Sequence, residues 1–217
     1  MSATVATGLA ATLRAHGRPQ RFRRGQALFV EGDRPERVLV IERGRVLVSC
    51  VAPSGREVVL GLCGPGELLG EMSALDGEPR SATATAIDDV QVTVAAVSVL
   101  LGALERPEVA REVIQTMAAR LRDGNRMRLE FAALGTLGRV AWRVLELGER
   151  FGGHDGDGIA VDVPLSQEQL ASWCGASREA TVKALARLRA LGAITTGRRR
   201  IVIRDPAALR RLARGLA

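Results

Sequence analysis

The hydrophobic pattern changes its period near Pro107, and this change limits the possible folds more than any other feature. Before it, short apolar runs alternate with turns rich in Gly, Pro, Asp and Glu; the runs span residues 27–30, 38–41, 46–51, 58–62, 83–87 and 90–97. Short strands at this spacing predict an antiparallel roll or barrel, and a helix is expected before them over residues 1–16. After Pro107 the apolar period is helical. The sequence therefore predicts an α+β fold.

The helical stretch after Pro107 has a seam with alternating steps of four and three residues: Ala110, Ile114, Met117, Leu121, Gly124, Arg128, Phe131 and Gly135. Such a seam is typical of a two-stranded coiled coil and predicts a homodimer. A long helix packed on its own roll is the alternative, because Gly124 and Arg128 interrupt the apolar seam. A glycine inside a helix costs about 1 kcal/mol relative to alanine, so Gly124 indicates close approach of a ligand or a partner backbone.

Composition bounds the class of protein. With 217 residues, 47% of them hydrophobic, the chain can bury one large or two modest cores. Its net charge of +7 is uneven, since residues 1–135 carry 17 basic and 16 acidic side chains and residues 136–217 carry 14 and 8. This basic C-terminal part predicts a polyanionic partner, nucleic acid rather than membrane. No bilayer-length apolar run or signal-like N-terminus occurs, so we expect a cytoplasmic protein.

The sequence offers little for metal, redox or catalytic chemistry. Cys50, Cys63 and Cys174 form an odd, scattered set that disfavours disulfides, zinc and iron–sulfur clusters. His16 and His154 have no second ligand at suitable spacing, which disfavours a metal or haem site. No nucleophile–base pair or P-loop is apparent, so we expect no catalytic residues and no enzyme activity.

Residues 69–83, Leu-Gly-Glu-Met-Ser-Ala-Leu-Asp-Gly-Glu-Pro-Arg-Ser-Ala-Thr, place Glu71 nine residues before Arg80. A buried carboxylate can accept a hydrogen bond from a ribose 2′-hydroxyl. A guanidinium matches two phosphate oxygens at once, and Ser81 with nearby backbone N–H groups can bind the rest of the phosphate. The pattern predicts a site for a cyclic phosphate on a ribose. An ordinary surface turn with a Glu–Arg pair is the alternative.

Other residues of this stretch support an anion site. Gly70 allows the backbone to approach a sugar closely. A short helical turn from Met72 to Asp76 would direct N–H groups and the positive end of its dipole at the anion. Pro79 fixes the approach to Arg80 and cannot extend that helix. We therefore include Gly70 and Met72 among the expected ligand contacts.

Two helices joined at Gly175 are predicted from residue 165 onward. Ser166 with Gln169 matches a capping box, and Ser177 is a natural N-cap for the second helix. Apolar residues at helical spacing are expected to share one core: Leu170, Trp173, Val182, Leu185 and Leu188. That arrangement leaves Arg178, Glu179 and Lys183 together on an outward face.

This outward face has the chemistry of a major-groove reader. Arg178 can bind guanine O6 and N7, and Glu179 can accept from a cytosine amino group, next to Lys183 and the cap Ser177. A solvated charge network is the alternative. Residues 193–203 predict a hairpin whose Arg198, Arg199 and Arg200 contact phosphates.

The segments that flank these elements complete the second half. Residues 135–138, Gly-Thr-Leu-Gly, are expected to interrupt the long helix, and a helix should follow over 138–150. Residues 151–158 are rich in glycine and aspartate and predict a mobile loop. A short basic helix is expected to start at Asp205-Pro206.

Two stretches resemble a known family. Gly-Glu followed by Gly-x-Pro-Arg-Ser-Ala-Thr is similar to the phosphate-binding cassette of cyclic-nucleotide-binding domains, and residues 25–33 and 38–48 resemble their opening strands. Gly-Ala-Ser-Arg-Glu-x-x-x-Lys-Ala-Leu, at 175–185, resembles the recognition helix of the CRP/FNR superfamily of transcription regulators. The resemblance spans residues 20–215.

The resemblance implies a cyclic-nucleotide-binding β-roll (jelly-roll-like) over 1–108, a dimerisation helix over 109–135 and a winged helix-turn-helix over 136–217. Glu71 would hold the ribose, and Arg80 with Ser81 the phosphate. Where the family has a polar pair that caps the purine, this chain has Gly124-Asn125. Asn125 can both donate to and accept from a base edge; a solvent-facing Asn125 is the alternative.

The implied function is a homodimeric regulator that binds near-palindromic double-stranded DNA, responds to a cyclic nucleotide and works with RNA polymerase. Cyclic AMP is the first candidate effector and cyclic GMP the second, with a shift at the hinge 135–138 as the expected response. One alternative is a regulator of the same superfamily that senses cyclic di-GMP or needs no ligand. Another is a nucleotide-binding module without DNA binding.

Overall fold

The computed structural model describes residues 7–162 and 165–215. Two compact units divide the chain, residues 2–122 and residues 123–217. The predicted N-terminal helix is α1 (Thr7–His16), while residues 1–6 of that prediction lie outside the described part. None of the helices within the described ranges combines the length and the hydropathy that crossing a bilayer requires.

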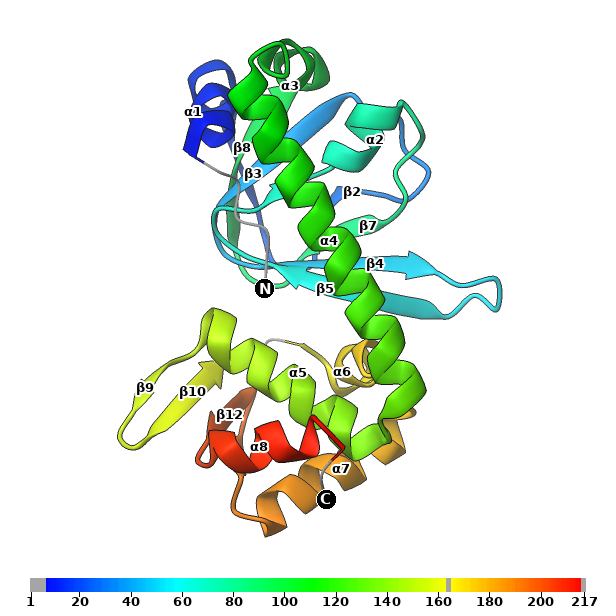
Figure 1. The fold of residues 1–217 in the computed structure, drawn as a ribbon, viewed down its shortest axis with the longest axis vertical. Helices are drawn as coiled ribbons and strands as arrows, with labels where there is room; N and C mark the ends of the chain where they lie inside the picture. The colour runs from blue at the N-terminus through cyan, green and yellow to red at the C-terminus, as the bar shows by residue number, and fades with distance from the viewer. Residues whose placement is uncertain (1–6, 163–164, 216–217) are drawn as a thin grey trace. The chain divides into compact units, whose positions relative to one another are not determined.

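The first unit is an antiparallel roll of two four-stranded sheets (Figure 1). One sheet has the order β1-β8-β3-β6, with β1 (Arg18–Phe22), β8 (Val90–Ala96), β3 (Arg37–Arg43) and β6 (Leu68–Leu69). The other has the order β2-β7-β4-β5, with β2 (Ala27–Phe29), β7 (Thr83–Ala86), β4 (Val46–Val51) and β5 (Glu57–Cys63). The predicted β-roll is confirmed.

Strand β3 shows why the first unit has two hydrophobic layers. Successive side chains of a strand point to opposite faces. Leu39 and Ile41 lie in the core between the sheets, with Phe29, Val46 and Leu69 among their neighbours. Val38 and Val40 lie in a second core, formed with α1, with α3 (Val97–Ala103) and with the start of α4 (Pro107–Ala133). The continuous apolar run 38–41 is therefore buried on both faces.

Sequence reasoning missed β1, β6 and α3. Four of the five residues of β1 are exposed and only Phe22 is buried, so no apolar alternation marks this strand. Helix α3 starts at Val97, directly after β8. One continuous apolar run covers the end of the strand and the start of the helix, so the pattern does not show where one ends and the other begins.

The seam of α4 is partly exposed within its own unit. Val109, Val113 and Thr116 are buried against the roll. Ile114 and Leu121, two predicted seam residues, are 67% and 65% exposed. Ile114 and Leu121 therefore do not pack on the roll, whereas Met117, which lies between them in the seam, is partly buried against the roll's second core.

The second unit contains the end of α4 and a winged helix-turn-helix. Its helices are α5 (Thr136–Phe151), α6 (Gln167–Trp173), α7 (Arg178–Ala190) and α8 (Pro206–Leu212). Its sheet has the order β11-β12-β10-β9, with β11 (Ile194–Gly197), β12 (Arg200–Ile203), β10 (Gly158–Asp162) and β9 (Gly153–Asp155). The predicted hairpin 193–203 and terminal helix are present.

The expectation of a mobile loop over 151–158 is wrong. Residues of this stretch form the hairpin β9–β10, in which Gly158 pairs with Asp155. Strand β10 also pairs with β12, where Ile159 lies opposite Ile203. This pairing with a distant strand orders a polar, glycine-rich segment whose local sequence predicts only a turn.

The predicted core of the helix pair needs one correction. Leu170, Trp173 and Leu188 are buried as expected, whereas Val182 is 38% exposed. Thr181 takes the inward position, because its hydroxyl donates to the carbonyl of Ser177 at 3.0 Å and is thereby satisfied.

Candidate nucleotide pocket and DNA-reading surface

The 69–83 stretch folds into a turn between two glycines with positive φ. Gly70 (φ 80°) precedes α2 (Glu71–Asp76), and Gly77 (φ 77°) ends it with an N–H that donates to the carbonyl of Ser73 at 3.0 Å. The Ser73 hydroxyl donates to the carbonyl of Pro79 at 3.2 Å, which fastens the following loop to the helix. The predicted short helical turn is confirmed.

Arg80 is fixed by its backbone and by its side chain. Its N–H donates to the carbonyl of Asp33 at 2.9 Å, and its carbonyl accepts from Gly32 at 2.8 Å. The side chain is buried; Nη1 donates to the carbonyl of Gly70 at 2.6 Å and Nη2 to that of Arg37. The guanidinium also lies 4.6 Å from the centre of the Phe29 ring.

Glycine at position 70 makes room for this guanidinium. A Cβ at Gly70 would lie 2.4 Å from Nη1 of Arg80, so any other residue at this position would force the guanidinium to shift. The positive φ independently favours glycine there. In the structure Gly70 admits Arg80, and the expected approach of a sugar to its backbone stays a prediction.

Glu71 is a buried carboxylate with spare acceptor capacity. Its side chain is 1% exposed, and Oε1 lies 2.9 Å from Nη1 of Arg120 on α4. Neither oxygen accepts a well-oriented hydrogen bond from the described part of the chain. Burial raises the pKa of Glu71, although the charge of Arg120, the nearby backbone N–H groups of Glu71 and Met72, and the charge of Arg80 oppose this shift.

Burial also acts on the basic side of the pocket. It lowers the pKa of Arg80, and repulsion from Arg37 acts in the same direction, whereas Glu71 and Asp33 raise it. Arg80 and Arg120 therefore flank the buried carboxylate of Glu71. This arrangement can bind a ligand that has both an anionic group and a hydrogen-bond donor.

The structure brings Gly70, Glu71 and Arg80 together, and Met72 and Ser81 are exposed neighbours of this cluster. Asn125 is exposed on α4 within the second unit, so its contact with a ligand stays a prediction. Sequence reasoning missed Arg120. Its Nη2 donates at 2.5 Å to the carbonyl of Leu68, 52 residues away in sequence, and no local pattern marks that approach.

Helices α6 and α7 start with the predicted caps. The Ser166 hydroxyl accepts from the N–H of Gln169 at 3.0 Å, and the Gln169 side chain accepts from the N–H of Ser166 at 2.9 Å. The Ser177 hydroxyl accepts from the N–H of Ala180 at 3.1 Å, so the first turn of α7 is fixed. Gly175 (φ 56°) provides the turn between the helices.

Arg178, Glu179 and Lys183 lie on the outward face of α7, as predicted, with side chains 64%, 77% and 76% exposed. Lys183 pairs with Glu179 at 2.7 Å, and Arg178 pairs with Glu168 at 3.3 Å. Exposed pairs of this kind contribute little to stability. The same groups are therefore available to a partner at low cost.

The wing ends in the predicted arginines. Arg198 and Arg199 form the tip of the hairpin β11–β12 and are exposed. Arg199 has φ 57°, the one positive φ of a non-glycine residue within the described ranges. Arg200 pairs with Asp155 of β9 at 3.2 Å, so its charge is shared with the neighbouring hairpin.

Possible metal ligands are scattered over the described residues, and the Cys174 side chain lies in the interior. Within the described ranges, no three His, Cys, Asp or Glu side chains gather as a metal site. Cys174 is buried, and burial raises its pKa to about 12, which keeps the thiol protonated and unreactive.

Comparison with protein-family models gives two matches. Residues 19–106 match the cyclic nucleotide-binding domain, and residues 138–212 match the Crp-like helix-turn-helix domain. The two matched ranges contain the pocket around Glu71 and the face of α7.

Similar proteins align with this chain over most of its length. The chain is 37% identical to the CRP-like cAMP-activated global transcriptional regulator of Mycobacterium tuberculosis H37Rv, over 90% of this chain and 88% of that protein. It is 32% identical to the global nitrogen regulator of Synechococcus elongatus, over 88% and 87%. The structure of FixK2 from Bradyrhizobium japonicum aligns with a TM-score of 0.80 and 25% identity, over 90% and 96%.

Fold, domain order and relatives define a transcription regulator with a cyclic-nucleotide-binding domain and a DNA-binding helix-turn-helix. The chain belongs to the CRP/FNR superfamily.

Proposed function

We propose that cyclic AMP binds between Glu71 and Arg80 and controls how a homodimer of this chain grips its operator. The observation that carries this proposal is the buried Glu71 carboxylate, which pairs with Arg120 and whose oxygens accept no well-oriented hydrogen bond from the residues that the structure describes. A ribose hydroxyl supplies the missing donor, and a cyclic phosphate supplies the anion for Arg80 and Ser81. The cAMP-activated relative from M. tuberculosis supports the choice of nucleotide.

Ligand binding would replace contacts that the pocket residues make with one another. Arg80 donates to two backbone carbonyls, and the phosphate competes for those donors. The ribose hydroxyl competes with Arg120 for Glu71. Because Arg120 belongs to α4, this exchange changes how that helix is held. A ligand shifts an equilibrium only through such differences in contact.

The dimer would form along α4. Its exposed seam borders an apolar groove of about 500 Å³ lined by Leu75, Leu104, Ala110, Val113, Ile114, Met117, Ala118 and Leu121. A second copy of the same helix matches this seam in length and pattern. Asn125 lies further along α4 and would cap the base of the nucleotide.

The α7 helices of the dimer would enter adjacent major grooves, one helical turn apart. Ser177, Arg178, Glu179 and Lys183 would contact bases and phosphates. Val182 is exposed on the same face, and its methyl groups fit the C5-methyl group of thymine. The wing arginines 198–200 would contact phosphates, and RNA polymerase is the expected partner at promoters.

Calorimetry with cyclic AMP, cyclic GMP and cyclic di-GMP tests the ligand, with Arg80→Leu as the pocket variant. We expect heat with cyclic AMP, none with Arg80→Leu, and operator binding by that variant that no longer depends on nucleotide. Thermal denaturation confirms that the variant is folded. Binding of cyclic di-GMP alone, or of no nucleotide, would favour the alternative of a regulator of the same superfamily that senses another ligand or needs none.

Promoter binding by Arg178→Ala and Lys183→Ala tests the alternative without DNA recognition. Both side chains are exposed, so the variants should fold normally. We expect a loss of sequence-specific binding in each. Unchanged binding would favour a nucleotide-binding module that acts without this helix.

A further inference from the structure

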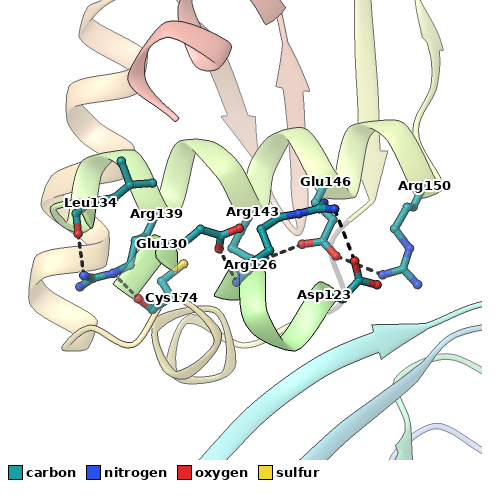
Figure 2. A network of polar contacts seen from close by, with 9 residues as sticks. All are labelled: Asp123, Arg126, Glu130, Leu134, Arg139, Arg143, Glu146, Arg150 and Cys174. Atoms are coloured by element: carbon teal, nitrogen blue, oxygen red, sulfur yellow. Dashed lines mark hydrogen bonds and ion pairs between the residues drawn. The ribbon is translucent and has the colours of Figure 1, made fainter. Parts of the chain in front are cut away.

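Two arginines of α5, Arg139 and Arg143, lie one helical turn apart and hold together three segments of the second unit (Figure 2). One segment is the end of α4, the second is α5 itself, and the third is the end of α6 with the turn that leads into α7. No pattern in the sequence marks this cluster, since its members are spread from residue 130 to residue 175.

Arg139 binds three backbone carbonyls that follow or end helices. Its Nη1 donates to the carbonyl of Leu134, just after α4, at 2.8 Å. Its Nε donates to the carbonyl of Cys174, the C-cap of α6, at 2.7 Å, and Nη2 to that of Gly175 at 3.3 Å. Carbonyls at helix C-termini lack intrahelical partners and carry partial negative charge, so one guanidinium satisfies two helix ends.

Arg143 joins the same three segments through contacts with side chains. It is buried, and its Nη2 donates to the buried carboxylate of Glu130 on α4 at 2.9 Å. Nη1 donates to Glu146 of α5 at 2.8 Å, and the guanidinium lies 5.2 Å from the ring centre of Trp173 on α6.

Phe131 of α4 adds an apolar contact at the same place. A Cβ built on Gly175 would lie 2.4 Å from Cε1 of Phe131, so the ring packs directly on the turn between α6 and α7. The Arg139 guanidinium lies 5.6 Å from the centre of that ring. Ser177, the N-cap of α7, is two residues beyond Gly175.

The cluster is poorly suited to serve stability alone. Buried ion pairs lose much of their attraction to desolvation, and apolar replacements are often as stable. The buried Nε of Arg143 lacks a hydrogen-bond partner in the described part of the chain, a further cost. The network does fix the positions of the helix ends relative to one another, because each planar guanidinium can bind its set of acceptors in one orientation only.

We propose that Arg139 and Arg143 are positioning residues that make the last turns of α4 and the start of α7 one rigid body. A displacement of the α4 end then moves the recognition helix with it, and this movement as one body takes the place of the shift at residues 135–138 that is expected from the sequence. This inference rests on the proposed nucleotide response and adds the part of the chain that transmits it.

The test is Arg139→Lys, which keeps the charge but replaces a three-donor fork by a point charge that cannot reach three carbonyls. The matched control is Arg210→Lys, an exposed arginine of α8 in the same unit. Operator affinity is measured by fluorescence anisotropy with and without saturating cyclic AMP, and nucleotide affinity by calorimetry. Glu130→Gln, which keeps the shape but not the charge, is the second variant.

We expect Arg139→Lys and Glu130→Gln to bind cyclic AMP within about two-fold of wild type, while the gain in operator affinity on adding cyclic AMP falls at least five-fold. By reciprocity, operator DNA should also lose its effect on cyclic AMP affinity in these variants. A role in folding alone would weaken operator binding equally with and without nucleotide; an unchanged gain in both variants therefore overturns the inference.

Hydrogen exchange separates this inference from the proposed function. In either ligand state, Arg139→Lys should speed amide exchange over residues 130–134 and 174–178, and Arg210→Lys should not. A wild-type protein without any nucleotide response would refute the proposed function. The exchange data would still show whether Arg139 joins the end of α4 to the start of α7. Unchanged exchange over both segments would refute this link between α4 and α7.

Discussion

Gly70→Ala should disable the nucleotide pocket through one added methyl group. Two terms contribute to the cost. A non-glycine residue at φ 80° costs roughly 1–2 kcal/mol. The new Cβ, 2.4 Å from Nη1 of Arg80, also displaces the guanidinium from the Gly70 carbonyl, and hydrogen bonds of charged groups contribute about 1.5–3 kcal/mol. We therefore expect unfolding free energy to fall by about 3 kcal/mol or more, with loss of cyclic AMP binding.

Gly77→Ala is the matched control for this substitution. Gly77 has nearly the same φ, 77°, and a Cβ there would meet no atom within 4 Å. It should lose only the conformational contribution, about 1–2 kcal/mol, and keep its nucleotide affinity. Urea denaturation gives both free energies, and calorimetry gives both affinities. Equal losses in the two variants would refute the argument that Gly70 exists to seat Arg80.

Four further outcomes are expected. Burial raises the pKa of Glu71, so between the ordinary and the raised pKa the folded state binds more protons than the unfolded state, and the unfolding free energy falls as pH rises through that window. A ribose donor favours the ionised carboxylate, so cyclic AMP affinity should rise with pH in the same window. Glu71→Gln should abolish both pH dependences, which calorimetry across pH measures. Arg199→Gly relieves a left-handed residue, worth roughly 1–2 kcal/mol, but adds about 0.5–1 kcal/mol of glycine backbone entropy; the unfolding free energy should therefore rise by at most about 1.5 kcal/mol, and the slope of log operator affinity against log salt should shrink by about 1. Leu121→Asp should give monomers by analytical ultracentrifugation while Gln115→Asp, off the seam, stays dimeric; a dimeric Leu121→Asp would contradict the α4 interface. Replacing operator thymines by uracil should weaken wild-type binding roughly four-fold at the contacted position, for a methyl worth about 0.8 kcal/mol, but leave Val182→Ala unaffected; equal losses in both would exclude Val182 from the reading face.

Features set by neighbouring residues could be predicted from the sequence. The capping box of Ser166 and Gln169 depends on a spacing of three residues, and it formed as expected. The turn 71–76 ends at a glycine, and the outward face of α7 follows from helical spacing. Each of these depends on backbone geometry within one or two turns, which local sequence specifies.

Features set by distant segments could not be predicted. Arg120 reaches Glu71 only because α4 passes over the roll. The hairpin β9–β10 is ordered by β12, and the carbonyls that Arg139 binds belong to two separate helix ends. Val182 and Thr181 are adjacent, and only the packed structure decides which of them points inward.

The most direct measurement for the central claim is the affinity of the wild-type protein for its selected operator, by fluorescence anisotropy, with and without saturating cyclic AMP. Coupling free energies between sites are typically about 1–3 kcal/mol, so we expect cyclic AMP to tighten operator binding by roughly five- to 150-fold, and Arg80→Leu to remove the difference. Identical operator affinity with and without the nucleotide, at concentrations where calorimetry shows the pocket to be filled, would contradict the account.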